Sequence, residues 1–295
     1  MTSQGSGNGK IILFGEHFVN YGCPALAVGL SNKAIVDIKP SPIIDFTTDI
    51  NGCNPDYSKK AIGYILKAMR INENFAVHLK GDLPTVGGLG SSAAFSVAIV
   101  RALDKKYDLK LTNEQVNDYA YEGEKSFHGE PSGVDNTMAT YGGAIKFIRG
   151  KGFTKLKILK SMNFVVASTG KSSPTSQMVA KVKEFKVNHP EKFKHIFSKI
   201  EQIILQGEKA IAEGDLDKIG HLMNENHKLL YEVGVSILEN EKIVEIFKTA
   251  GALGAKLTGG GGGGCCIALA KDINHAKEIL IKIKENGFDG FVTTS

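Results

Sequence analysis

PTVGGLGSSAA, residues 84–94, places a glycine-rich turn directly before a predicted helix that runs from Ser91 to about residue 105. Glycine leaves backbone amides uncovered and tolerates the positive φ angles that gather several amides around one anion. The positive end of the helix dipole adds to this attraction, and the serine pair is available to cap the helix or bind a metal. The stretch therefore predicts a phosphate-binding loop, with an ordinary tight turn as the alternative.

The composition indicates a folded protein with room for two domains. The chain has 295 residues, 42% of them hydrophobic and 23% charged, and its basic and acidic residues are spread along the whole length, which argues against binding of nucleic acid or of a membrane. The four cysteines show neither metal-ligand spacing nor a disulfide framework, so we expect free thiols. Because no apolar run is long enough for a membrane helix and the polar N-terminus is unlike a secretory signal, we expect a cytoplasmic protein.

Strand and helix patterns alternate along the chain. In the first half, Thr112 and Gln115 form a capping-box pattern that predicts a helix ending near His128. The other elements predicted in this half are strands at 10–14, 34–39 and 75–80 and a helix at 57–69.

The second half predicts an α+β domain with an antiparallel sheet, because strands and amphipathic helices are interleaved there. We place the domain boundary near residue 160. The predicted elements are strands at 163–168, on either side of a glycine run and at 288–294, and helices at 191–213, 215–232, 241–250 and 274–286.

Three further segments hold polar residues that suit catalysis. In GKIILFGEHFVNYG (9–22), a lysine precedes an apolar strand that leads into Gly-Glu-His; taken alone, such charged groups are usually solvent-exposed. In KLTGGGGGGCC (256–266), six glycines form either a flexible linker or a loop over a ligand, and the strand-forming residues on both sides favour the loop.

The segment EKSFHGEPSGVDN (124–136) supplies carboxylates. Glu124 falls on the helix face of Ala120 and Phe127, where a carboxylate needs a partner such as a metal ion, unless it is exposed at a fraying helix end. Asp135 follows a Pro-Ser-Gly turn, where an Asp is often a turn residue.

Taken together and in this order, the segments resemble the motifs of the GHMP kinases, and the resemblance covers nearly the whole chain. The motifs that carry it are GKIILFGEHFVNYG, GLGSSAA, HGEPSGVDN and KLTGGGGGGC. The resemblance implies a two-domain α+β fold. Residues 1–160 would form an ATP-binding N-terminal domain like domain 2 of ribosomal protein S5. Residues 161–295 would form a ferredoxin-like C-terminal domain, with the active site in the cleft between the two.

The resemblance also implies ATP-dependent phosphorylation of a small hydroxyl compound, with Mg²⁺ as cofactor. Galactokinases carry an Arg and Asn around Gly-Glu-His and an Asp-Tyr after it, and homoserine kinases lack the element, whereas this chain has FVNYG at 18–22. The expected substrates are therefore mevalonate and ATP, as in the mevalonate pathway of isoprenoid biosynthesis. The alternatives are a sister kinase acting on phosphomevalonate or a sugar, and a non-catalytic sensor. A homodimer is left open.

The resemblance implies a role for each residue of this chain that matches a family motif. Asp135 would accept or orient the proton of the attacking hydroxyl, and Lys10 would keep Asp135 ionised and stabilise the transferred phosphoryl group. Ser92 and Glu124 would bind Mg²⁺. The nucleotide phosphates would be cradled by Gly87, Gly88, Leu89, Gly90, Ser91 and Ser92.

The resemblance also implies which residues lie near the acceptor, the compound that receives the phosphoryl group. Glu16 and His17 match residues that line the mevalonate pocket, and Thr258 would lie in the C-terminal loop near the transferred phosphate. The chain departs from the family at three places: Gly7-Asn8-Gly9 replaces Ala-Pro-Gly or Ser-Pro-Gly before the lysine, Val86 replaces a glycine, and residues 173–175 lack an arginine that many relatives carry.

Overall fold

The computed structural model describes residues 2–85, 87–171 and 173–295. Their contacts form two units, one of residues up to 10 with 29–142 and one of residues 11–28 with 143–295. Strands β1 (Ser3–Phe14) and β2 (Ala25–Ser41) contribute to both units, so no single cut separates them. The division at residue 160 stays a prediction about family domains, which these contacts do not test.

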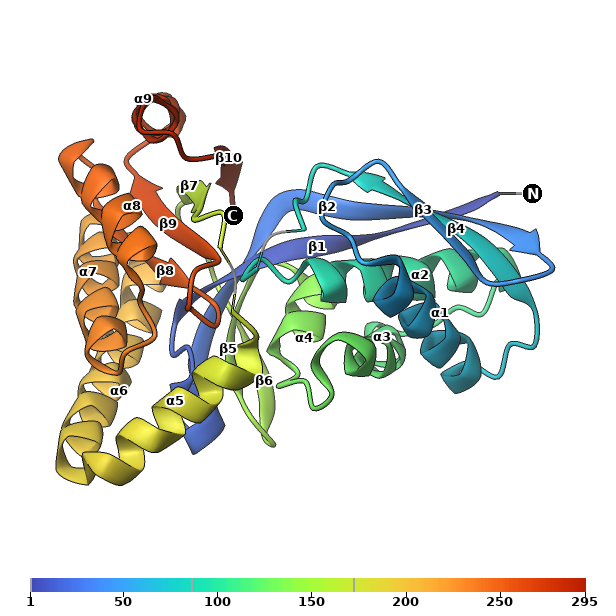
Figure 1. Cartoon of the computed structure of the whole chain (residues 1–295), viewed down its shortest axis with the longest axis horizontal. Helices are drawn as coiled ribbons and strands as arrows, with labels where there is room; N and C mark the ends of the chain where they lie inside the picture. Colours follow the sequence, from blue (N-terminus) through green and yellow to red (C-terminus); the bar gives the residue numbers. More distant parts are fainter. Residues whose placement is uncertain (1, 86, 172) are drawn as a thin grey trace. The chain divides into compact units, whose positions relative to one another are not determined.

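The first unit places helices on one side of a sheet (Figure 1). Residues 34–41 of β2 pair antiparallel with β4 (Asn74–Gly81), β3 (Asp45–Thr48) runs parallel to β4, and β1 pairs with β2. The sheet confirms the strands predicted at 34–39 and 75–80. The helices are α1 (Pro55–Ala68), α2 (Ser91–Tyr107), α3 (Asn113–His128) and α4 (Val134–Tyr141).

Strand β1 begins earlier than we predicted, because its glycines fit against the alanines of α2. A Cβ on Gly7 would lie 2.1 Å from the carbonyl oxygen of Ala94, and one on Gly5 would lie 2.2 Å from that of Ala98. Only residues without a side chain allow this approach. The start predicted at Lys10 was therefore wrong, and the close packing brings Lys10 to the beginning of α2.

Helix α3 begins and ends as predicted. The Thr112 side chain accepts from the Gln115 amide and the Gln115 side chain accepts from the Thr112 amide, so the capping box is present. Helix α4 was not predicted, because the Pro-Ser-Gly sequence before it reads as the start of a loop. Its N-cap is Gly133, which has a left-handed backbone conformation.

The second unit contains an antiparallel sheet in the order β10-β7-β9-β8. Numbered within this sheet, the order is 4-1-3-2 with helices after the first and third strands, the ferredoxin-like arrangement that we expected. The strands are β7 (Asn163–Ser168), β8 (Gly254–Thr258), β9 (Cys265–Ala270) and β10 (Gly290–Thr294).

Helices cover this sheet and extend away from it. Helices α7 and α8 contact β8, and α9 contacts β7 and β10. Helix α5 and the hairpin β5–β6, which pairs with residues 25–28 of β2, were not predicted. The elements are η1 (Phe18–Tyr21), β5 (Ala144–Ile148), β6 (Gly152–Leu156), α5 (Thr175–Asn188), α6 (Pro190–Glu213), α7 (Leu216–Glu232), α8 (Leu238–Thr249) and α9 (Ile273–Glu285).

The helices and the cysteines bear on two further expectations. Within the described ranges, every helix is too short or too polar to cross a lipid bilayer. All four cysteines are free thiols, as expected. Burial raises the pKa of Cys266 to about 12, so this thiol is protonated and unreactive.

The packing at Gly90 generates a stability prediction. Gly90 has a φ of 68°, and a Cβ there would lie 2.9 Å from Cγ of Lys10. Gly90→Ala should lose about 1–2 kcal/mol of unfolding free energy from the left-handed backbone alone, and more because it displaces Lys10. The control is Gly150→Ala, at a φ of 77° with open space around it. Equal losses in urea unfolding would show that the contact with Lys10 is unimportant.

Candidate active site

The glycine-rich loop that begins at Gly87 leads into α2 with its helix amides uncovered. Gly88 has a φ of 100° and Gly90 a φ of 68°, the backbone conformation that gathers successive N–H groups on one side. Gly90 is the N-cap of α2, and none of the described side chains caps it. Of the two roles open to the serine pair, capping is not observed, and the Ser92 hydroxyl donates instead to Glu124; metal binding stays a prediction. The first amides of α2 are therefore suited to an anion.

Lys10 and Asp135 form an ion pair at the end of this loop. The Lys10 ammonium lies 3.1 Å from Oδ1 of Asp135 and donates to the carbonyl oxygen of Gly88 at 3.2 Å. The Lys10 side chain is 2% exposed and that of Asp135 is 29% exposed, so the ammonium is enclosed while the carboxylate reaches the surface. Asp135 sits in the first turn of α4. The first unit thus brings Lys10, Asp135 and the loop together.

Glu124 lies on α3 and is completely buried, as its helix face predicted. Its Oε2 accepts from Oγ of Ser92 at 3.2 Å and lies 3.8 Å from Nε2 of His128. The same His128 nitrogen lies 3.3 Å from Oγ of Ser92. Sequence reasoning gave His128 no role, although its spacing of four residues from Glu124 places both on one helix face.

The environment of Glu124 disfavours its charge. Burial raises the pKa of the Glu124 carboxyl to about 8, and the charge of Asp135 contributes in the same direction. The hydrogen bond from Ser92 and the charge of Lys10 offset part of this effect. Burial also lowers the pKa of His128, so its imidazole is neutral at pH 7 and does not balance the carboxylate. Among the described residues, Oε1 of Glu124 has no hydrogen-bond partner.

These groups fit a magnesium ion. Glu124 and Ser92 offer carboxylate and hydroxyl oxygens, the hard ligands that Mg²⁺ prefers, and an unpartnered buried carboxylate oxygen is stabilised by a cation. The described part of the chain contains no cluster of three or more His, Cys, Asp or Glu side chains able to hold a metal alone. Because Mg²⁺ usually takes one or two protein ligands and completes its shell with water and phosphate oxygens, the site suits a metal that arrives with a nucleotide.

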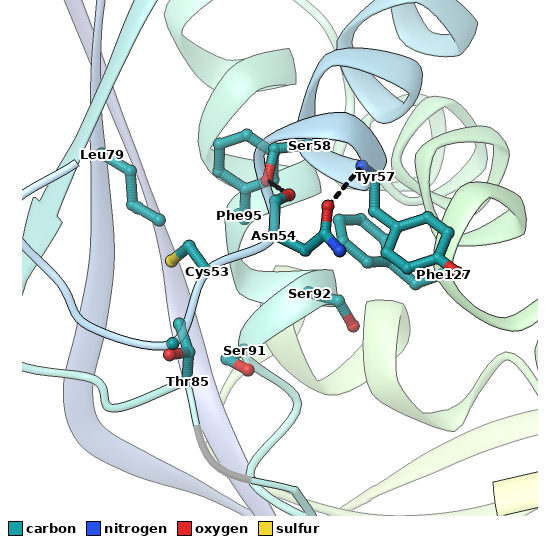
Figure 2. A pocket seen from close by; sticks show the side chains of 11 residues that line it. Cys53, Asn54, Tyr57, Ser58, Leu79, Thr85, Ser91, Ser92, Phe95 and Phe127 are labelled. Carbon is teal, nitrogen blue, oxygen red and sulfur yellow. Dashed lines mark hydrogen bonds between the residues drawn. The ribbon is translucent and has the colours of Figure 1, made fainter. Parts of the chain in front are cut away.

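A pocket opens beside the start of α2 in the first unit (Figure 2). Figure 2 shows Ser91 and Ser92 among the side chains that surround it. The aromatic rings of Tyr57 and Phe127 line it with their centroids 6.3 Å apart. The remaining lining residues are Gly52, Cys53, Asn54, Ser58, Leu79, Thr85 and Phe95. The pocket thus combines apolar walls with hydroxyl groups at the helix start.

Glu16 and His17 lie in the second unit, after the end of β1. Glu16 is 1% exposed and forms an ion pair with the ammonium of Lys256, which is fully buried. Its Oε2 also accepts from Nδ2 of Asn226 at 3.3 Å. His17 has a φ of 50°, which is uncommon for a residue with a side chain, and its Nε2 lies 2.9 Å from the carbonyl oxygen of Gly260.

Thr258 ends β8 in the same unit. Its hydroxyl accepts from the amide of Ile12 and donates to the carbonyl oxygen of Ile12, both at 3.1 Å. The hydroxyl therefore joins β1 to β8, and its place near a transferred phosphate stays a prediction. The glycines at 259–264 connect β8 with β9, so the run is a loop within one sheet, as expected, and does not link two domains.

Lys256 and Asn226 were not predicted as site residues. A lysine in the otherwise apolar strand GAKLT is a signal that could have revealed a buried charge, since lysine is almost never fully buried without a partner. No comparable signal marks Asn226, which lies on an amphipathic helix among other polar residues.

Two of the family departures lie in the described part of the chain. Asn8 is in β1, and its amide donates to the carbonyl oxygen of Ala139 in α4 at 3.4 Å, so it links the strand of Lys10 to the helix of Asp135. Pro174, in the segment without the arginine, is the N-cap of α5. Val86 lies outside the described residues.

Family models match the chain in the order that the motifs predict. The model of the GHMP kinases N terminal domain matches residues 56–143, which contain the glycine-rich loop, Glu124 and Asp135. The model of the GHMP kinases C terminal matches residues 208–289, which contain Lys256 and Thr258.

Named relatives match over nearly the whole length. The mevalonate kinase of Thermococcus gammatolerans is 34% identical over 304 residues, covering 92% of this chain and 90% of the relative. That of Pyrococcus furiosus is 33% identical over 315 residues, covering 96% and 93%. The crystal structure of L. major mevalonate kinase in complex with R-mevalonate is 36% identical, with a TM-score of 0.94 over 100% of this chain and 96% of that chain. Because the family models and these relatives agree, this chain belongs to the GHMP kinase family.

Proposed function

We propose that this chain transfers the γ-phosphoryl group of ATP to the hydroxyl of mevalonate. The observation that carries the proposal is the ion pair of Lys10 and Asp135, 3.1 Å long, beside a loop that leads into the amino end of a helix. Relatives over more than nine-tenths of the chain are named mevalonate kinases, which supports mevalonate over phosphomevalonate or a sugar.

Lys10 and Asp135 would carry out the transfer. Phosphoryl transfer requires an aligned hydroxyl and neutralisation of the charge that spreads over the moving group, with little covalent chemistry. The partly exposed carboxylate of Asp135 would receive the hydrogen bond of an acceptor hydroxyl. The ammonium of Lys10, between Asp135 and the loop, would hold that carboxylate ionised and stabilise the phosphoryl group.

Ser92 and Glu124 are assigned to Mg²⁺. When bound, Mg²⁺ would neutralise charge on the nucleotide phosphates. The residues assigned to the nucleotide phosphates are Gly87, Gly88, Leu89, Gly90, Ser91 and Ser92.

The pocket beside α2 is assigned to the nucleoside of ATP. Tyr57 and Phe127 offer aromatic faces to a planar base, and the pocket adjoins the serines assigned to the phosphates. Concave sites with apolar walls and a few polar groups are the usual form of such pockets.

The acceptor is assigned to the segment of Glu16 and His17 and to the loop that follows Thr258. The L. major relative was solved with R-mevalonate, and this segment carries the Gly-Glu-His motif. A non-catalytic sensor is less well supported, since the chain keeps Lys10, Glu124 and Asp135.

The substrate assignment is tested by ADP release with Mg²⁺ and ATP. Purified protein should turn over mevalonate with a higher kcat/KM than phosphomevalonate, homoserine or galactose. Preference for any of the other three would move the assignment to a sister kinase. Binding of mevalonate and ATP without ADP release would support the sensor.

Replacement of the catalytic carboxylate should separate turnover from nucleotide binding. Asp135→Ala should lower kcat by about 10²–10⁴-fold, the range for removal of a general base, while the Kd for ATP from calorimetry stays within about threefold. The control is Asp118→Ala, an exposed Asp on α3, which should match the wild type. A parallel loss of ATP affinity and rate would contradict this division of roles.

Glu124→Gln should stabilise the metal-free protein at high pH and weaken its use of Mg²⁺. The Glu124 carboxyl has a pKa of about 8 in the folded chain against 4.5 as its ordinary value. Between pH 4.5 and 8, the folded protein therefore keeps a proton on Glu124 that the unfolded chain has lost. As the pH rises through this range, the folding stability of the metal-free wild type should fall. The glutamine variant lacks this slope, so in EDTA its melting temperature relative to wild type should be higher at pH 9 than at pH 5.

The same variant should need at least about tenfold more Mg²⁺ for half-maximal activity, the scale of effect seen when groups around a metal are altered. Glu122→Gln, a partly exposed neighbour on the same helix, is the matched control and should change neither property. An unchanged Mg²⁺ requirement in Glu124→Gln would remove Glu124 from the metal site.

A further inference from the structure

Both oxygens of the Glu16 carboxylate have partners within the second unit. One oxygen pairs with the ammonium of Lys256, and the other accepts from Asn226 at 3.3 Å. Glu16 is 1% exposed, and Lys256 and Asn226 are 0% exposed. A carboxylate in this position is a buried counter-charge, with no exposed oxygen to offer a ligand.

Lys256 ties this carboxylate to the backbone around it. Besides the ion pair, its ammonium donates to the carbonyl oxygen of Leu257 at 2.7 Å and to that of Ile12 at 3.5 Å. An ammonium has three N–H donors, so it can serve all three of these oxygen atoms. The side chain therefore fixes the end of β1 against β8, where the hydroxyl of Thr258 binds Ile12 as well.

The residue after Glu16 is held in a strained conformation. His17 has a φ of 50°, and such a backbone persists only where its surroundings enforce it. On one side is the buried carboxylate of Glu16. On the other, Nε2 of His17 lies 2.9 Å from the carbonyl oxygen of Gly260 in the glycine loop.

The tautomer of His17 follows from these contacts. A carbonyl oxygen only accepts hydrogen bonds, so Nε2 must carry the proton. Burial lowers the pKa of His17, so the ring is neutral at pH 7 and Nδ1 is left as an acceptor. A ring held in this way has a defined orientation and a defined acceptor nitrogen.

We propose that Lys256 and Asn226 are positioning residues for the acceptor, which act by holding Glu16 as a buried counter-charge that fixes the conformation of His17. Glu16 then serves the acceptor through His17 and does not touch it. The inference rests on the proposed function for the nature of the acceptor, but the geometry of His17 can be tested without it.

A double-mutant cycle tests whether Glu16 and Lys256 act on the acceptor as one unit. Glu16→Gln and Lys256→Met each leave one buried charge unpaired, and each should raise the KM for mevalonate at least about tenfold, while the Kd for ATP stays within about threefold. The double variant leaves no unpaired charge, so its KM should be no higher than that of the worse single variant. If Glu16 and Lys256 act on the acceptor independently of each other, the two losses in KM multiply, which would overturn the proposal.

A milder variant covers the case in which the single charge variants do not fold. Asn226→Ala removes one hydrogen bond to Glu16 and keeps the ion pair, so it should raise the KM for mevalonate by about three- to tenfold, with an unchanged Kd for ATP. An unchanged KM in this folded variant would remove Asn226 from the proposal.

A spectroscopic test is independent of activity. In ¹⁵N-histidine-labelled protein at pH 7, the His17 signals, assigned with His17→Gln, should show a neutral ring protonated at Nε2. They should shift in Asn226→Ala and in the double variant, whereas those of His78, an exposed residue of the first unit, should not. Unchanged His17 signals in both variants would overturn the inference even if mevalonate is a substrate. If mevalonate is not a substrate and the signals shift, only the proposed function fails.

Discussion

The first unit is organised around two carboxylates that share one lysine. Glu124 is completely buried, and Asp135 lies close enough to contribute to the raised pKa of its carboxyl. Lys10 pairs with Asp135 and offsets only part of the effect on Glu124. An arrangement that leaves a buried carboxylate short of positive charge is unfavourable in the empty protein. It becomes favourable when a cation and a polyphosphate bind next to it, as expected for a nucleotide site.

In the second unit, the buried carboxylate is paired with groups of the protein itself. Glu16 is matched by Lys256 and Asn226, so the carboxylate is compensated without any ligand. Such a pair contributes little net stability but destabilises strongly when one partner is lost. The two buried carboxylates therefore suit the different roles that we propose. Glu124 would bind the metal that arrives with the nucleotide, whereas Glu16 would maintain the conformation of the segment around His17.

Much of the fold could be predicted from the sequence, because local signals and tertiary packing agree there. The loop before α2, the capping box at Thr112 and the strands around the glycine run all combine a backbone requirement with the pattern of the elements beside it. The features that were missed depend on long-range contacts. The polar residues at the start of β1 give no strand signal, since the glycines there are explained only by their packing against Ala94 and Ala98 of α2. The serines before α2 look like caps, but Ser92 is drawn to Glu124, 32 residues away.

The position of a bound metal decides whether Glu124 and Ser92 form the metal site. We would determine a crystal structure of the protein with Mn²⁺ and a non-hydrolysable ATP analogue, and locate the metal by its anomalous signal. We expect the peak within direct coordination distance of a carboxylate oxygen of Glu124 and of Oγ of Ser92, with Asp135 still paired with Lys10. A metal bound to Asp135, with Glu124 protonated and unligated, would contradict this assignment.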